Sequence, residues 1–125
     1  MIAATEGKLA VFNGRGGLEL TDILRAGCAG LIPAPECVDV QVRIYEAMRA
    51  GDEAAADVLY REILPLITFL MQSIESFLCY GKRLLARRLG LGEVHVRAPA
   101  LPPTDFGLAC LERHAAGLGP LLPVD

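Results

Sequence analysis

The stretch VFNGRGGLELTDILRAGCAGLIPA, residues 11–34, holds two short apolar runs separated by a helical pattern. The first run, KLAVF at 8–12, ends at an Asn-Gly pair that favours a turn. Leucine and isoleucine then gather on one side of a helix, which Gly27 is placed to terminate. The second run, AGLIPA, covers 29–34. Strand, helix and strand in this short space predict a βαβ unit with parallel strands.

The rest of the chain has a helical pattern. Asp52 and Thr104 stand where N-cap residues are expected, each before a run of helix-forming residues. Two parallel strands followed only by helices make a lopsided chain, because parallel strands normally have both faces covered. The pattern therefore indicates the end part of a larger unit. The predicted helices cover 35–51, 52–77, 78–90 and 105–117.

The glycines Gly14, Gly16 and Gly17 raise the question of a phosphate-binding loop. A Walker loop requires lysine and then serine or threonine after its last glycine, and none follows here. The dinucleotide fingerprint requires a glycine three places after Gly16, where this chain has Glu19. A tight turn between strand and helix explains the glycines better.

Charge and hydropathy argue against two classes of partner. The net charge of −3 provides no electrostatic attraction to nucleic acid. The longest apolar stretch, ILPLITFLM at 63–71, is far shorter than the roughly 20 residues of a transmembrane helix. We therefore expect neither nucleic acid nor a membrane as partner. The first residues lack the basic and apolar regions of a secretory signal, which predicts a cytoplasmic protein.

Neither lysine of the chain looks like a nucleophile. An amine that forms a Schiff base needs a desolvated pocket. Lys8 opens the first predicted strand, at the end opposite to that where barrel enzymes place their chemistry. Lys82 lies in a predicted helix with Arg83, Arg87 and Arg88, and we expect these side chains to form a solvated basic face.

The cysteines and histidines suggest no metal site. No two cysteines form a CxxC pair, so we expect reduced thiols in the core and no metal. His95 and His114 have no companions at ligand or triad spacing, and surface or cap positions are expected for both. The uncharged stretch 63–74 is instead predicted to be a seam between helices or between subunits. The four cysteines are Cys28, Cys37, Cys79 and Cys110.

A series of short patterns points to a known family. They are N-G at 13–14, G-L-I-P at 30–33, A-M-R-A-G-D-E-A-A-A at 47–56, L-P-L at 64–66, L-G-L at 89–91 after Lys82, and R-A-P at 97–99. In this order the patterns resemble the C-terminal part of the dihydrodipicolinate synthase and N-acetylneuraminate lyase family, the pyruvate-dependent class I aldolases and dehydratases. The resemblance covers almost the whole chain.

The resemblance implies an α/β fold, the C-terminal portion of a TIM (β/α)8 barrel with a helical extension, mostly helical overall. It implies that Gly14 lies at the mouth of the seventh strand with its backbone towards the substrate. Ile32 then corresponds to the eighth-strand residue that lines the pocket. Residues 15–17 lack the family's acidic pair, and Pro33 replaces a small residue. These departures favour the branch that handles sugar acids or other 2-keto acids.

The resemblance also implies how the chain divides. Residues 1–50 correspond to the last two βα units and residues 51–125 to the helical extension, which together make one incomplete domain. The family's Schiff-base lysine and catalytic tyrosine come from strands that would precede residue 1. No catalytic residue is therefore assigned, and we expect a truncation, a split gene or a mis-called start. The tyrosines of this chain, Tyr45, Tyr60 and Tyr80, all lie in predicted helices.

Two functions remain open at this stage. In the first, the chain is a fragment of a Schiff-base-forming lyase that acts on pyruvate or another 2-keto acid, inactive alone and without a cofactor. The family implies a homo-oligomer, a dimer or a tetramer, for the intact protein. In the second, the chain is a non-catalytic helical interaction module derived from the end of the barrel.

Overall fold

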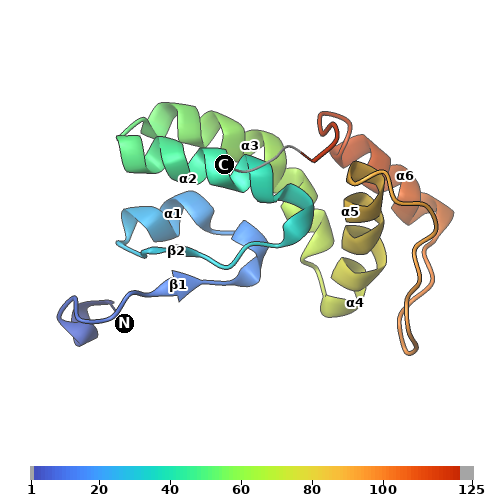
Figure 1. Cartoon of the computed structure of the whole chain (residues 1–125), viewed down its shortest axis with the longest axis horizontal. Helices are drawn as coiled ribbons and strands as arrows, with labels where there is room; N and C mark the ends of the chain where they lie inside the picture. The colour runs from blue at the N-terminus through green and yellow to red at the C-terminus, as the bar shows by residue number, and fades with distance from the viewer. Residues whose placement is uncertain (1, 122–125) are drawn as a thin grey trace.

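The computed structural model describes residues 2–121 and is mostly helical, with one small parallel sheet (Figure 1). Its elements in chain order are η1 (Ile2–Thr5), β1 (Phe12–Asn13), η2 (Arg15–Gly17), α1 (Leu20–Arg25), β2 (Gly30–Leu31), η3 (Pro35–Cys37), α2 (Val38–Ala50), α3 (Glu53–Leu70), α4 (Ile74–Ser76), the π-helical turn η4 (Phe77–Gly81), α5 (Lys82–Arg88) and α6 (Asp105–His114).

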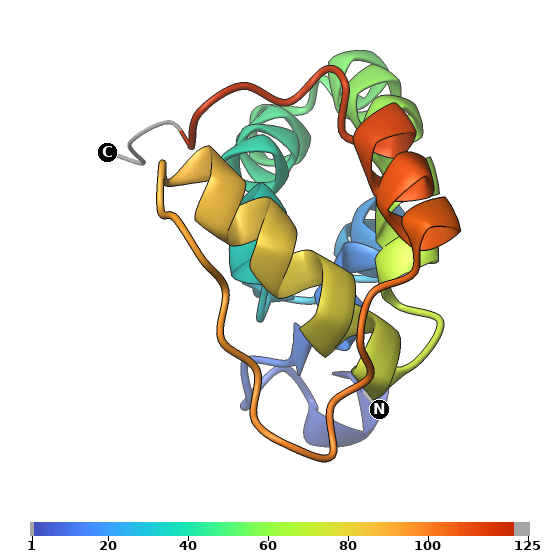
Figure 2. The same ribbon diagram turned by 90° about the vertical axis from the view of Figure 1, so that its right-hand side faces the viewer.

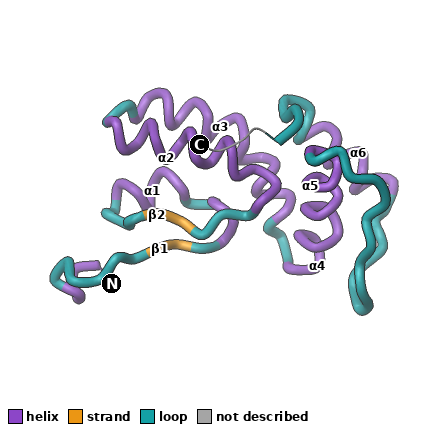
Figure 3. The backbone as a smooth tube through the Cα atoms, viewed as in Figure 1, coloured by secondary structure: helices purple, strands orange, loops and turns teal. Residues whose placement is uncertain are grey.

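The predicted strand–helix–strand unit is confirmed. Strands β1 and β2 are parallel, with Phe12 opposite Gly30 and Asn13 opposite Leu31. Each strand is only two residues long, shorter than the sequence predicted. No third strand pairs with either of them within residues 2–121, so nothing extends the hydrogen-bond ladder. Figure 3 shows how small this sheet is beside the helices.

Helices cover one side of the sheet. Figures 1 and 3 place α1, α2 and α3 on the same side of the two strands. Large apolar side chains in and beside the strands are exposed: Leu9 by 67%, Phe12 by 56% and Ile32 by 68%. The expectation that these strands need further neighbours agrees with this exposure.

The predicted helix ends are confirmed where side chains or glycine specify them. Asp52 caps α3, because its Oδ1 accepts a hydrogen bond from the N–H of Ala55 at 3.0 Å. Thr104 caps α6 in the same way, accepting from the N–H of Gly107 at 3.0 Å. Helix α2 ends before Gly51, whose φ of 80° is a conformation that glycine adopts readily.

The prediction of one continuous helix over 52–77 is wrong. Helix α3 ends at Leu70, and a new helical run begins after Ser73, whose Oγ accepts a hydrogen bond from the N–H of Ser76 at 3.0 Å. The helix axis bends by 105° between the two runs, which cover Glu53–Leu70 and Ile74–Arg88. Among the described residues no single helix is long and apolar enough to cross a membrane, and this bent pair meets both criteria only when taken together.

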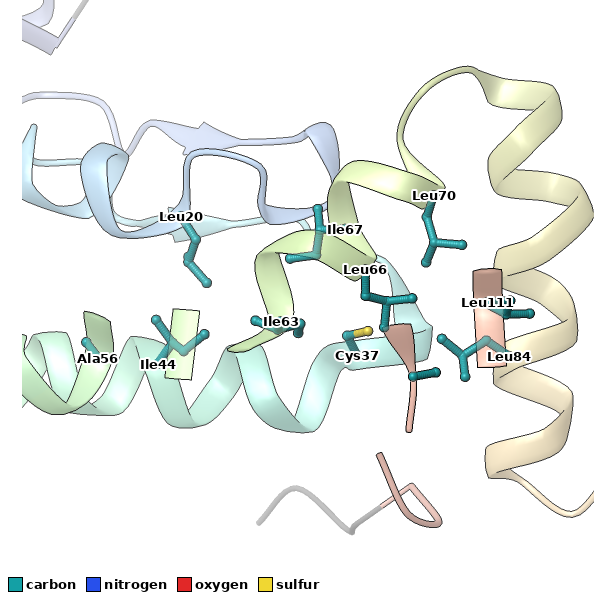
Figure 4. Packing of buried hydrophobic residues seen from close by; sticks show 11 residues of the cluster. Leu20, Cys37, Ile44, Ala56, Ile63, Leu66, Ile67, Leu70, Leu84 and Leu111 are labelled. Atoms are coloured by element: carbon teal, nitrogen blue, oxygen red, sulfur yellow. The ribbon is translucent and has the colours of Figure 1, made fainter. Parts of the chain in front are cut away.

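The core lies between the helices, with α3 at its centre (Figure 4). The part of the predicted seam inside α3 packs between helices, with Ile63, Leu66, Ile67 and Leu70 buried, while Ile74 is 74% exposed and contributes nothing to this packing. The cluster takes residues from both sides of residue 50, so the helical extension and the strand-bearing part share one core. Its larger members are Leu20, Ile44, Ile63, Leu66, Ile67, Leu70, Leu84 and Leu111.

Two glycines after β1 pack tightly against helices. A Cβ added to Gly16 would lie 2.9 Å from the Sδ of Met71. A Cβ on Gly17 would lie 2.6 Å from the Nε2 of Gln41, and φ at Gly17 is +94°. The same Nε2 of Gln41 donates a hydrogen bond to the carbonyl of Gly16 at 2.7 Å. The loop that follows β1 is therefore held between α2 and the end of α3.

We expect Gly17→Ala to lower the free energy of unfolding by about 3 kcal/mol, because it strains the backbone and displaces the buried amide of Gln41. Gly92→Ala is the matched control, since a Cβ there meets nothing within 4 Å and its φ is not positive. Urea unfolding of both variants measures the difference. Equal midpoints for the two variants would show that the contact is not tight.

The expectation that Arg88 belongs to a solvated basic face is wrong. Arg88 is only 5% exposed, and its guanidinium forms a two-pronged ion pair with Asp39 of α2. The two N···O distances are 2.9 and 2.7 Å. A carboxylate 49 residues away has drawn the side chain inwards, which the local charge pattern does not reveal.

Next to this pair lies a second buried carboxyl group. Glu36 is 3% exposed, and its Oε2 has no hydrogen-bond partner among the described residues. Burial raises the pKa of Glu36, and this outweighs the opposing effects of its own backbone N–H and of the Arg88 charge. The folded protein therefore holds the proton of Glu36 more tightly than the unfolded chain does.

This pKa predicts a pH dependence of stability. A carboxyl group with a raised pKa in the folded state contributes stability at low pH, and the contribution is lost as pH rises from the ordinary value of 4.5 through the folded pKa. Relative to the parent, Glu36→Gln should therefore become more stable as pH rises from about 4 to 7, since it has no proton to lose. Urea midpoints at both pH values measure this. A variant that loses stability relative to the parent as pH rises would contradict the prediction.

Candidate functional site

The two residues assigned to substrate binding, Gly14 and Ile32, lie at the same edge of the sheet. Asn13 is opposite Leu31, and its carbonyl accepts a hydrogen bond from the N–H of Ile32 at 2.7 Å. Gly14 and Ile32 are the next residues along the two strands, so they come together at the carboxyl ends. This edge is open, because Ile32 is 68% exposed and a Cβ on Gly14 would meet nothing within 4 Å.

Charged side chains border this edge. Arg15, directly after Gly14, forms an ion pair with Glu19 one helical turn later. The Nδ2 of Asn13 donates to the Oε2 of Glu19 at 3.5 Å. The side chain of Arg15 is 67% exposed, so an anion at the surface can reach it. This pair was not predicted from the sequence, because i,i+4 spacing indicates an ion pair only where the conformation after β1 is known.

Neither lysine is placed as a nucleophile. Lys8 is exposed and pairs with Glu6 at 2.6 Å, four residues before β1 begins. The Nζ of Lys82 donates to the carbonyl of His95 at 3.2 Å and holds the connection between α5 and α6. An exposed amine in either setting lacks the desolvated pocket that a Schiff-base nucleophile needs.

The tyrosines lie in helical segments, as expected, and each has a structural partner. The hydroxyl of Tyr45 donates to the carbonyl of Ala29 at 3.2 Å, and that of Tyr60 donates to the carbonyl of Leu18. Both bonds connect a helix to the βαβ unit. The hydroxyl oxygen of Tyr80 lies 3.4 Å from the Oγ1 of Thr104. Burial raises the pKa of Tyr60, with Asp22 and Glu19 adding to the effect.

The thiols and histidines form no reactive set in the described part of the chain. All four cysteines are free, and burial with the neighbouring Glu36 raises the pKa of Cys37 to about 12, which makes it a poor nucleophile. The ring of His114 packs at 5.7 Å from that of Phe69. Among residues 2–121, no three side chains of the metal-binding types gather at a spacing that could hold an ion.

The larger cavities lie away from the strand ends. One of about 800 Å³ is lined by residues of α3 and α6. Another of about 760 Å³ lies between the start of the second helical run and the 95–100 connection. A smaller one of about 200 Å³ lies between the strands and α2. Gly14 and Ile32 line none of these three. In this chain the candidate site is therefore an open edge, which offers a cation, an apolar side chain and free backbone, and which can form one wall of a pocket.

Comparisons with known proteins bear on this fold. No protein-family model and no curated protein sequence matches the chain. In structure, it matches a dihydrodipicolinate synthase from Rhodopseudomonas palustris with a TM-score of 0.81 and 26% sequence identity. The match covers 88% of this chain and 36% of that enzyme. The chain thus spans about a third of the length of the protein that it resembles.

The sequence patterns predicted that nearly all of this chain would resemble a minor part of a longer enzyme, and the structural match has this form. The predicted resemblance is therefore confirmed, and the chain is similar to the dihydrodipicolinate synthase family in the manner of a C-terminal part of such a protein.

Proposed function

We propose that this chain is the C-terminal part of a Schiff-base-forming lyase of the dihydrodipicolinate synthase type, acting on pyruvate or another 2-keto acid. Residues 1–50 supply the last two βα units of a TIM barrel, and residues 51–125 supply the helical extension. The observation that carries the proposal is the structural match to such an enzyme at a TM-score of 0.81. The parallel pairing of β1 and β2 supports it.

The chemistry of the intact protein follows from its nucleophile. A lysine amine attacks the C2 carbonyl of the keto acid, water leaves, and the cationic imine stabilises negative charge at the adjacent carbon. Cleavage of a carbon–carbon or carbon–oxygen bond then becomes easier. The lysine and the catalytic tyrosine of the family lie outside these 125 residues, so this chain alone is inactive. The reaction needs neither a metal nor an organic cofactor.

The role of this chain is to build part of the pocket. Gly14 leaves room for the substrate beside the end of β1, and Ile32 provides an apolar wall beside the end of β2. The exposed guanidinium of Arg15 suits an anionic substrate such as a keto acid. The partner is thus a small carboxylate. We expect the intact protein to be a cytoplasmic homo-oligomer, as the family resemblance implies.

One observation favours the second candidate, a non-catalytic helical interaction module. The main core cluster consists largely of residues from the helices, and it is closed without any side chain from β1. A chain of this kind can keep its helical packing when the barrel chemistry is absent. The two candidates therefore differ in whether, in the cell, a polypeptide with the family's lysine is joined to this chain or bound by it.

The recombinant 125-residue chain, treated with pyruvate and borohydride, should show no adduct by mass spectrometry, because its two lysines are exposed. The same chain, isolated from the cells that produce it, should be joined to or bound by a polypeptide whose lysine does give the adduct. The R. palustris enzyme serves as the positive control for trapping. An adduct at Lys8 or Lys82 contradicts the first expectation, and native chain recovered alone supports the interaction module.

Within the native assembly, Gly14→Val should reduce the trapped adduct about tenfold, the effect expected when a bulky group enters a substrate wall. A Cβ there meets nothing within 4 Å, but the backbone angles φ −102° and ψ −136° are unfavourable for valine, so adducts are compared at equal amounts of folded assembly. Val94→Ala, in the connection before α6, is the control that keeps the edge intact. Adduct yields that are equal in the two variants would remove Gly14 from the substrate wall.

A further inference from the structure

Arg88 uses all five of its N–H groups. Nη1 donates to the carbonyl of Glu36 at 2.7 Å and to Asp39 at 2.9 Å. Nη2 donates to the second oxygen of Asp39 at 2.7 Å and to the carbonyl of Pro120 at 3.3 Å. Nε donates to the carbonyl of Gly119 at 2.8 Å. A guanidinium offers five donors in a fixed fork, so this site is fully satisfied.

These bonds join two distant segments to the end of α5. The first segment follows β2 and leads into α2, since Glu36 lies in η3 and Asp39 in the first turn of α2. The second is the tail at 119–121, where the N–H of Leu121 also donates to the carbonyl of Arg88 at 3.0 Å. Figure 2 shows the chain passing from α6 across to the far end of α5, where this contact lies.

The burial of Arg88 makes the tail part of the ion-pair site. If the tail leaves, two N–H groups of a buried cation lose their acceptors, and the guanidinium must rotate or take in water to satisfy them. Either response disturbs the bond to the carbonyl of Glu36. That carbonyl lies four residues after Ile32, and Pro33 and Pro35 stiffen the connection between them. A change at Arg88 is therefore transmitted to the end of β2.

We propose that Arg88 is a positioning residue through which the tail at 119–121 holds the end of β2, and with it Ile32, in place. This inference rests on the proposed function, in which Ile32 is a wall of the keto-acid pocket. The helical extension then positions the pocket wall at Ile32 without contacting the substrate itself.

The test compares two shortened chains by hydrogen exchange. One ends at Leu118 and lacks the acceptors of Arg88, and the control ends at Leu121 and keeps them. Loss of the tail should speed exchange of residues 30–38 about tenfold, the size expected for one lost hydrogen bond to a charged group. The amide of Ile32 is the direct reporter, because it donates to Asn13 across the sheet. Residues 63–70 of α3 report global unfolding.

A double variant, Arg88→Met with Asp39→Leu, removes the donors together with the carboxylate that pairs with them. It should speed exchange in the same 30–38 segment and leave α3 protected. Unchanged exchange at 30–38 in the chain that ends at Leu118 would overturn the proposal. An equal rise over 30–38 and 63–70 would also overturn it, because the effect would then be a general loss of stability.

A second readout separates this inference from the proposed function. In the native assembly, the chain that ends at Leu118 should need several-fold more pyruvate for half-maximal trapping, with the same adduct at saturation, because a displaced wall weakens binding and leaves the lysine unchanged. An unaltered half-maximal concentration would count against positioning. Absence of any adduct with the control chain would instead reject the lyase, while the exchange result would still decide whether the tail holds β2.

Discussion

The buried ion pair between Arg88 and Asp39 is the constraint on which the arrangement of the helices depends. Removing two charges from water costs several kcal/mol for each, and only good geometry with every donor satisfied offsets it. Here the fork of the arginine meets the carboxylate at 2.9 and 2.7 Å, and three carbonyl groups take the remaining N–H groups. The end of α5, the start of α2 and the tail must therefore come together at one point.

The core and the sheet follow from this arrangement. With α2 and α5 fixed at one end, α3 fills the space between them and buries Ile63, Leu66 and Leu70. Within residues 2–121 the strands pair only with each other, and Phe12 and Ile32 remain exposed. A stable parallel sheet buries both faces, and two strands of two residues each cannot do so. The stability of the chain therefore resides in its helices, and its candidate site lies on the less protected part.

The sequence predicted those features that depend on neighbouring residues. The caps at Asp52 and Thr104 and the end of α2 before Gly51 each involve residues within one turn, and all are confirmed. The parallel pairing of the strands was also predictable, because a helix between two strands leaves little choice of direction. The meeting of Gly14 and Ile32 at one edge follows from that pairing.

Features that depend on distant residues were not predictable. Arg87 and Arg88 are neighbours in one basic run, and the charge pattern does not show that Arg87 is exposed while Arg88 is buried by distant acceptors, chiefly Asp39 on another helix. The break after Leu70 is set partly by the Ser73 cap, which the absence of charge, glycine and proline between Leu66 and Ile74 does not reveal. In the candidate site, the sequence led to the edge through a family resemblance, while the pairing of Arg15 with Glu19 required the helix register after β1.

A cluster of glycines after a strand can bind phosphate or can allow helices to pack closely against a loop, and here the second role applies. A phosphate loop requires small residues so that backbone N–H groups can approach an anion. Gly16 and Gly17 are buried, and the atoms that would collide with a side chain at these positions are the Sδ of Met71 and the Nε2 of Gln41. Small residues are needed here so that two helices can approach the loop. That approach fixes the loop beside Gly14 and leaves Gly14 itself open at the edge where a substrate wall is proposed.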